Sequence, residues 1–261
     1  MIVLQEDFVM GKLADFFLLS IRLSALFLAA PILSASAVSL PIRIALTLGI
    51  TVVLAGVIPV PKVDIAAPAG IMLIFGEALI GLTIGLIFQL AFAALAIAGE
   101  QMAASMGLGF AAMVDPQSGS QSQVITQFLT ILMTLIFLVV GGHHVMLRHL
   151  ADSYQVLPIG GPINTAMMMG VVRAASLMFS AALIIALPIL ILLFLVNILI
   201  GLMTRVSPQM NIFSVGFPFT ILVGFTVLLV SLPTVANGMT NLITTVSDVA
   251  RDLILTERPQ P

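Results

Sequence analysis

Long apolar blocks separated by short polar or proline-rich breaks dominate the hydrophobic pattern of this chain. A helix needs roughly 20 apolar residues to cross a typical bilayer. We therefore predict an all-α, polytopic membrane protein with broken and kinked helices, and six spans are the simplest count. On that count most basic residues share one side with both termini, which places the termini in the cytoplasm. The blocks are 16–33, 45–58, 65–98, 124–140, 174–203 and 216–232.

Proline interrupts or follows several of these blocks. A proline inside a helix removes one backbone hydrogen bond and usually kinks or ends the helix. We expect Pro188 to kink the block 174–203 and Pro233 to end the block 216–232. The tail 234–261 is mildly amphipathic, and the block 45–58 is marginal for a full span.

Composition supports the membrane assignment. Of the 261 residues, 61% are hydrophobic and only 8% are charged, and the mean hydropathy is +1.25. Soluble domains carry about 25% charged residues. The net charge of -2 is too small to indicate a nucleic-acid partner, and the absence of cysteine excludes disulfides and thiolate metal sites.

The run 99–123, here called the central segment, is the least membrane-like part of the middle of the chain. It is rich in small residues, methionine and glycine, then becomes polar, and it holds no Lys or Arg. Irregular backbone at membrane depth is tolerated only where protein buries it or where it lines a water-filled cavity. One interpretation is a flexible loop whose soft apolar side chains lie across a passage through the protein. The other is an ordinary external loop between two spans. The residues concerned are Met106, Gly107, Gly109, Phe110, Met113, Asp115 and Pro116.

A small and polar helix face precedes the central segment. Glu77, Gly81, Gly85 and Gln89 recur every four residues and therefore share one face of a helix. The same face continues at spacings of three or four through Ala93, Ala96, Glu100, Ala103 and Gly107. Small residues at this spacing let another backbone approach closely. We expect this helix to pack on protein along much of its length.

Charged residues within the apolar pattern need partners. A charge at the centre of a membrane helix costs on the order of 2.5–3.5 kcal/mol on insertion scales. Arg22, Glu77, Glu100 and Arg173 are the residues concerned. We favour pairing between helices or between subunits, because the acids do not cluster as they would in a relay. A proton or ion relay is the alternative.

Catalytic and metal-binding patterns are missing from the sequence. His143 and His144 are adjacent, so they point to different faces of a helix and make a poor metal pair. The chain holds no G-x-x-x-x-G-K-[ST] nucleotide-binding loop and no recognisable nucleophile elbow. We expect no enzyme activity, no cofactor and no metal.

Two long motifs carry a resemblance to a known family. The first spans 99–157 and includes MGLGFAAMVDPQSGSQSQVITQF, GGHH and SYQVLP; the second, 201–224, reads GLMTRVSPQMNIFSVGFPFTILVG. With Arg22, Pro31, Arg43 and Glu77 upstream, these motifs resemble the FliR family of flagellar export-gate membrane proteins. A related branch occurs in virulence-type injectisomes.

This resemblance implies a fold and partners. The chain would be a single-copy subunit whose helical hairpins pack with FliP and FliQ homologues into a multi-subunit export gate, next to FlhB and surrounded by membrane lipid. The gate would pass unfolded flagellar proteins across the bacterial inner membrane at the flagellar basal body. Residues 1–165 would form a FliP-like part and 166–261 a FliQ-like hairpin with a C-terminal tail.

The resemblance also implies site residues. The family's plug loop falls on 106–121, within the central segment. A stand-alone small-molecule permease or channel is the competing class, and an intramembrane hydrolase lacks candidate catalytic residues. The expected subunit-packing residues are Arg22, Glu77, Gly81, Gly85, Glu100, Arg205, Pro208 and Asn211.

Overall fold

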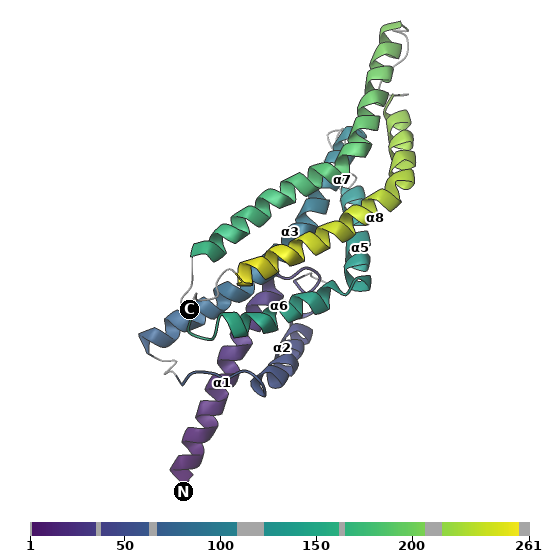
Figure 1. The fold of residues 1–261 in the computed structure, drawn as a ribbon. Helices are drawn as coiled ribbons and strands as arrows, with labels where there is room; N and C mark the ends of the chain where they lie inside the picture. The colour runs from purple at the N-terminus through teal and green to yellow at the C-terminus, as the bar shows by residue number, and fades with distance from the viewer. Residues whose placement is uncertain are drawn as a thin grey trace. The chain divides into compact units, whose positions relative to one another are not determined.

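A computed structural model describes residues 2–34, 38–62, 67–108, 123–161, 165–206 and 216–255. Within these ranges the chain forms seven α-helices and no strand, so the all-α prediction is confirmed (Figure 1). The helices are α1 (Ile2–Ala29), α2 (Leu40–Ala55), α3 (Pro68–Ser105), α5 (Gln123–Val139), α6 (Gly142–Val156), α7 (Thr165–Val206) and α8 (Phe217–Leu255).

Proline and glycine set several of the helix boundaries. Pro41 lies in the first turn of α2, where a missing N–H removes no helical hydrogen bond. Gly141 separates α5 from α6 and has a φ of +76°, a left-handed conformation that glycine adopts without steric cost. Gly107 follows the end of α3 with a φ of +80°. Local chemistry at these positions therefore explains where the helices stop.

Pro188 and Pro233 both lie inside helices. The prediction that Pro233 ends its helix is wrong, because α8 continues to Leu255. Beyond this proline the helix buries an apolar stripe that includes Val235, Met239 and Val246. Burial of this stripe offsets the loss of one backbone hydrogen bond, so the amphipathic tail is helical as far as the structure describes it.

The predicted count of six spans is also wrong for the described ranges. By length and composition, three helices are able to cross a membrane: α3, residues 169–206 of α7 and residues 217–254 of α8. A fourth span would require α5 and α6 to act together as one broken span. α1 carries Lys12, Asp15 and Arg22, and α2 has only 16 residues. The chain is thus a polytopic membrane protein with fewer simple spans than its apolar blocks indicate.

The chain forms two compact units, each assembled from several segments. The first unit contains Met1–Leu90, Gly141–Ala175 and Thr245–Pro261; the second contains Ala91–Val140 and Ser176–Thr244. α3, α7 and α8 therefore each contribute to both units. The division into 1–165 and 166–261 that the family resemblance implies stays a prediction.

Each unit has its own apolar core. In the first unit Leu19, Leu23 and Leu26 of α1 and Ile87 of α3 are completely buried. The second unit buries Met102, Leu129, Met133 and Leu193, and its Phe92 and Phe137 rings meet edge-on at 5.6 Å. Much of the remaining apolar surface stays exposed. In the most apolar 18-residue part of α7 and of α8 only 22% is buried, whereas in that of α3 50% is buried.

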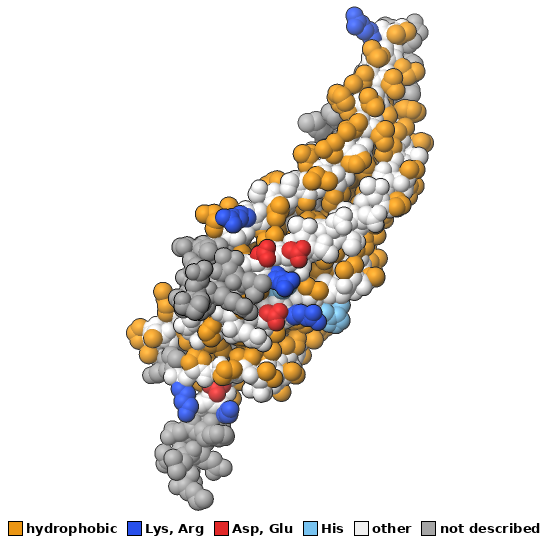
Figure 2. All heavy atoms as spheres, viewed as in Figure 1, with side chains coloured by type: hydrophobic (Ala, Val, Ile, Leu, Met, Phe, Trp, Pro, Cys, Tyr) orange, Lys and Arg blue, Asp and Glu red, His pale blue; other side chains and the backbone are white. Residues whose placement is uncertain are grey.

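Charged side chains gather in a small part of the first unit. Arg148 and Asp152 of α6 are exposed, as are Asp248, Arg251 and Asp252 near the end of α8. Figure 2 shows such a cluster of charged and histidine side chains beside extensive hydrophobic surface. This part of the first unit therefore presents charged groups suited to contact with water.

Candidate functional site: a buried ion pair and the anchors of the central segment

A completely buried arginine joins three helices of the first unit. Arg22 of α1 has no exposed surface and pairs with Glu77 of α3, which is 2% exposed. Its Nε donates to Glu77 Oε2 at 2.7 Å, and its Nη2 donates to Glu77 Oε1 at 3.0 Å. This two-point arrangement of guanidinium and carboxylate is the strongest geometry for such a pair.

Ser153 of α6 and Leu157, just after α6, accept the remaining hydrogen bonds of the guanidinium group. Arg22 Nη1 donates to Ser153 Oγ at 2.9 Å, and Nη2 also donates to the Leu157 carbonyl oxygen at 3.0 Å. The guanidinium carbon lies 4.1 Å from the centre of the Tyr154 ring, and the Tyr154 hydroxyl donates to the Leu19 carbonyl at 3.0 Å. Both the charge and the hydrogen-bond donors of Arg22 are thus satisfied by α3 and α6.

The small face of α3 packs directly on α1. A Cβ atom at Gly81 would overlap the Arg22 carbonyl oxygen, and one at Gly85 would lie 2.8 Å from the Leu26 carbonyl oxygen. Backbone atoms are not free to move aside, so only glycine permits this approach. The expectation that this face packs on protein is confirmed, and α1 of the same chain is the element it contacts.

In the second unit, α8 holds the C-terminal end of α3. Met106 is completely buried, and its Cε would lie 2.7 Å from a Cβ atom placed at Gly224. A Cβ at Gly107 would lie 2.8 Å from Cδ1 of Phe217. Gly107 is therefore required both by its left-handed φ and by the aromatic ring beside it.

Two further contacts fasten the helices that flank residues 109–122. Asn197 of α7 donates from Nδ2 to the Ser105 carbonyl oxygen at 3.2 Å, which satisfies one carbonyl of the last turn of α3. Gly99 of α3 packs against the start of α5, where its Cβ would lie 2.8 Å from Thr126 Cα. The two ends of the central segment are thus held next to each other.

Comparison with known proteins identifies the family. Residues 13–246 match the family described as Bacterial export proteins, family 1. The chain belongs to this family. Its relatives include the flagellar biosynthetic protein FliR of Pectobacterium carotovorum subsp. carotovorum, 39% identical over 92% of this chain and 93% of that protein. FliR of Escherichia coli K12 is 35% identical over 90% of each chain, and FliR of Bacillus subtilis is 30% identical over 92% and 94%.

The structure of this export-family chain places the predicted charged residues in two different settings. Arg22 and Glu77 pair inside the chain. Glu100, Arg173 and Arg205 are exposed on helix surfaces. Arg205 lies in the last turn of α7, where the helix dipole favours a positive charge. Contact of the exposed residues with neighbouring subunits stays a prediction.

Most of the predicted plug of this export protein lies outside the described residues. Met106, Gly107 and Leu108 are the described residues of this plug: Met106 and Gly107 are packed against α8, and Leu108 is buried. The part of the central segment from Gly99 to Ser105 is helical, as the three- and four-residue spacing predicts, and Met102 and Ala103 are buried there. The predicted residues outside the described ranges are Gly109, Phe110, Met113, Asp115, Pro116, Pro208 and Asn211.

Several residues that position the site of this export protein were not singled out from the sequence. Ser153, Tyr154, Asn197, Phe217 and Gly224 all make contacts described above. Tyr154 is the only tyrosine in the chain, and Asn197 is an isolated amide in a long apolar block. Both residues could therefore have been recognised from the sequence as unusual. Within the described ranges, His, Cys, Asp and Glu side chains form no group of three or more able to hold a metal ion.

Proposed function

We propose that this chain is a subunit of the flagellar protein-export gate, in which FliP-like and FliQ-like subunits complete a passage for unfolded flagellar proteins across the bacterial inner membrane, with FlhB as a neighbour. The main support for this proposal is that residues 13–246 match the family and that the alignments with FliR proteins extend over at least 90% of each chain. The flagellar relatives favour this role over the injectisome branch. We assign the chain no catalytic activity.

Exposed apolar surface on a helix too short to span supports assembly with partners. α2 has 16 residues, and Leu40, Val52 and Val53 on it are each more than 60% exposed. A helix of that length falls short of the roughly 20 residues that a bilayer requires. Neighbouring subunits that cover such surfaces remove the need for every apolar helix to cross lipid.

The closed Arg22–Glu77 cluster argues against the permease alternative. A permease that binds a polar substrate needs polar groups open to that substrate. Arg22 instead makes four hydrogen bonds within the chain and has no exposed surface. The pair therefore serves as a structural connection between helices.

A deletion and complementation experiment tests the export role. In the bacterium that carries this chain, loss of the gene abolishes secretion of filament subunits into the medium and abolishes swimming, and a plasmid copy restores both. Levels of filament subunit inside the cell serve as the control, because an export defect leaves synthesis intact. Normal secretion and swimming in the deletion strain would refute the proposal.

Co-purification tests the partners. Expressed alone in detergent, the chain aggregates or is degraded, and co-expression with FliP-like and FliQ-like proteins yields a soluble complex. The reason is the large apolar surface left open on α7 and α8. A monodisperse and long-lived monomer would favour a stand-alone permease instead.

We further propose that residues 107–120 close the passage, with Phe110 and Met113 as the apolar seal. An apolar constriction excludes water and ions by dewetting. Replacing residues 110–120 with a glycine-serine linker of equal length makes assembled gates leak ions, while Met106 and Gly107 keep their contacts with α8. Phe110→Asn leaks more than Phe110→Ala, because it wets the constriction as well as widening it. Equal ion flux in parent and linker variant would leave this stretch as a connecting loop.

A further inference from the structure

His149 lies where three helices of the first unit meet. The residue belongs to α6 and is 6% exposed. Its Nε2 is hydrogen-bonded to the Ser247 Oγ of α8 at 2.9 Å, and its ring lies beside the Phe88 ring of α3, with 6.1 Å between the ring centres. It is the only buried histidine of this chain, because His143 is half-buried and His144 is exposed. One titratable ring therefore links α6 to both α3 and α8.

The surroundings of His149 favour its neutral form. Met146 and Leu150, its neighbours on α6, are each 1% exposed, and its hydrogen-bond partner on α8 is a neutral hydroxyl. A charged imidazolium in this position would lose its hydration, and a single hydroxyl compensates that loss poorly. α6 has 15 residues, which are too few to cross a bilayer alone. Burial lowers the pKa of His149 below its usual value of 6.5.

The charged groups around this ring oppose one another. After burial, the influences on the pKa of His149 are Asp152, which raises it, Arg251 and Arg148, which lower it, and Asp248, which raises it. Two of these residues belong to α6 and two to α8, whereas α3 carries no charged residue within ten positions of the ring contact. All four charged side chains are exposed, so water and its protons reach the edge of this junction. Burial therefore decides which form of the ring the fold accommodates.

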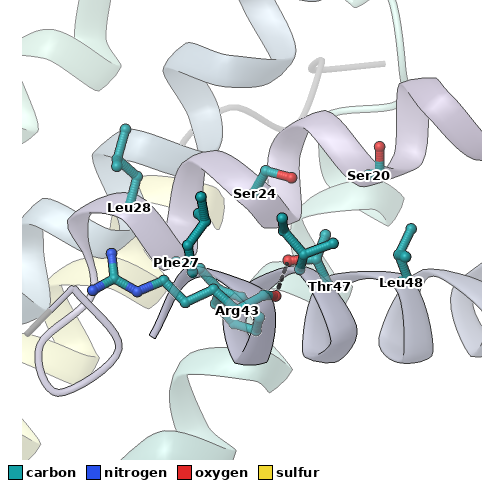
Figure 3. A pocket seen from close by; sticks show the side chains of 9 residues that line it. Ser20, Ser24, Phe27, Leu28, Arg43, Thr47 and Leu48 are labelled. Carbon is teal, nitrogen blue, oxygen red and sulfur yellow. Dashed lines mark hydrogen bonds between the residues drawn. The ribbon is translucent and has the colours of Figure 1, made fainter. Parts of the chain in front are cut away.

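The cavity between α1 and α2 offers no comparable group. It has a volume of about 220 Å³, and Figure 3 shows the side chains of both helices along it, with Arg43 among them. Of the residues that line this cavity, none is acidic and none is histidine. Arginine keeps its charge at every physiological pH. This cavity therefore does not respond to pH near neutrality, whereas the junction at His149 does.

We propose that His149 is a pH-sensitive latch between α6 and the last turns of α8, closed by the neutral imidazole and loosened when the ring gains a proton. A protonated ring leaves the junction for water, which breaks the hydrogen bond to Ser247 and the contact with Phe88. The latch contributes fully above about pH 6.5, where the ring is neutral in both the folded and the unfolded chain, and it weakens as the pH falls through the lowered folded value. The inference depends on the geometry of the first unit and not on the export role.

Hydrogen exchange at the histidine C2 position tests the protonation directly. The rate of this exchange, followed by mass spectrometry across a series of pH values, gives the pKa of each histidine in the folded chain. We expect His149 to titrate below 6.5 and to exchange more slowly than the exposed His144. The assay needs only folded, full-length chain, so it applies to a co-purified complex and equally to a stable monomer.

Amide hydrogen exchange tests the loosening of α8. From about pH 7.5 to about pH 5.5, after correction for the intrinsic rate, we expect exchange in residues 245–254 to become roughly fivefold faster, the change that loss of one hydrogen bond produces. His149→Gln keeps a polar amide beside Ser247 but cannot gain a proton, so exchange in this variant no longer responds to pH. Ser247→Ala exchanges faster at both pH values. His144→Gln, at an exposed position of the same helix, is the matched control and retains the response.

Three results would overturn the proposal. The first is a pKa of His149 at or above 6.5. The second is exchange in residues 245–254 that is equal at the two pH values in the unsubstituted chain. The third is a pH response that persists unchanged in His149→Gln. Should that variant fail to fold, the two measurements on the unsubstituted chain decide the question.

Discussion

α3 meets its neighbours in two different ways in the two compact units. In the first unit Glu77 forms a buried ion pair with Arg22, and Gly81 packs on backbone atoms of α1. In the second unit the flexible side chain of Met106 lies against Gly224. The first contact requires fixed positions of charged and backbone groups, whereas the second uses an adaptable thioether. One end of α3 is therefore held rigidly, and the other tolerates adjustment.

This difference matches the roles proposed for the two regions. A fully paired guanidinium group keeps α1, α3 and α6 in one arrangement, since any movement would separate buried charges. Methionine is unbranched and fits irregular spaces, so the contact at the end of α3 can adjust. Substitutions in the two regions test whether the first contact is rigid and the second is adaptable.

The largest effect is expected from removal of one partner of the buried pair. Glu77→Ala leaves Arg22 charged and buried, and we expect a loss of about 3–5 kcal/mol in the free energy of unfolding. The measurement is SDS-induced unfolding of this chain within its co-purified complex, followed by the loss of its protease resistance. The double variant Arg22→Met/Glu77→Leu regains much of the loss, because no charge stays buried. Glu100→Ala, at an exposed position, is the control. If Glu77→Ala behaves like Glu100→Ala, the pair does not fix the helices.

The next effect concerns the contact of α3 with α1. Gly81→Ala places a Cβ against the Arg22 carbonyl oxygen, and we expect a loss of about 1–3 kcal/mol because the backbone must move. Gly49→Ala in α2 is the matched control, since nothing lies within 4 Å of its added Cβ. That control stabilises the helix by up to about 1 kcal/mol through helix propensity. Unfolding of both variants within co-purified complexes compares them directly, and equal stabilities would refute close packing at Gly81.

A smaller effect is expected at the adaptable contact. Gly224→Ala meets only the Met106 side chain, so we expect a loss of about 1 kcal/mol, less than for Gly81→Ala. A double-mutant cycle with Met106→Ala measures the coupling: the double variant is more stable than the sum of the single losses predicts. Strict additivity of the two substitutions would show that Met106 and Gly224 do not interact.

The smallest effect concerns the hydrogen bond between α7 and the end of α3. Asn197→Leu removes the donor to the Ser105 carbonyl oxygen, and hydrogen bonds between membrane helices contribute about 0.6 kcal/mol on average. Stability therefore changes little. Hydrogen exchange of the last turn of α3 is the more sensitive measurement, and we expect it to become faster at Ser105 and Met106. Unchanged exchange in this turn would contradict a role for Asn197 in holding it.

Local patterns in the sequence were enough to predict helices and a close-packed face, but not partners or spans. The four-residue spacing of Glu77, Gly81 and Gly85 identified a face that packs on protein. Arg22 lies 55 residues before Glu77 and was expected to need a partner. Periodicity within one helix does not indicate which other helix packs against it, so this partner was not predicted. The span count failed because the apolar blocks at α1 and α2 were counted as spans. α1 carries several charged residues, and α2 is too short to cross a bilayer.

The boundary prediction at Pro233 failed because tertiary burial outweighed a local signal. Pro233 is a strong local stop, yet apolar residues on the following turns keep α8 helical. The small residues from Gly99 to Ser105 lie in a regular helix, and close contact with α5 requires a small residue at Gly99. Glycine alone does not distinguish a flexible segment from tight helix packing.

The contact between Gly99 and Thr126 also determines how freely the chain between α3 and α5 can change in length. Because this contact already fixes α3 beside the start of α5, lengthening the stretch adds only loop-closure entropy, about 0.6 kcal/mol for each doubling in length. Insertions of several residues between 109 and 122 are therefore compatible with the same helical frame. If residues 107–120 close the passage as proposed, variation in their length alters what passes while the helical frame stays the same.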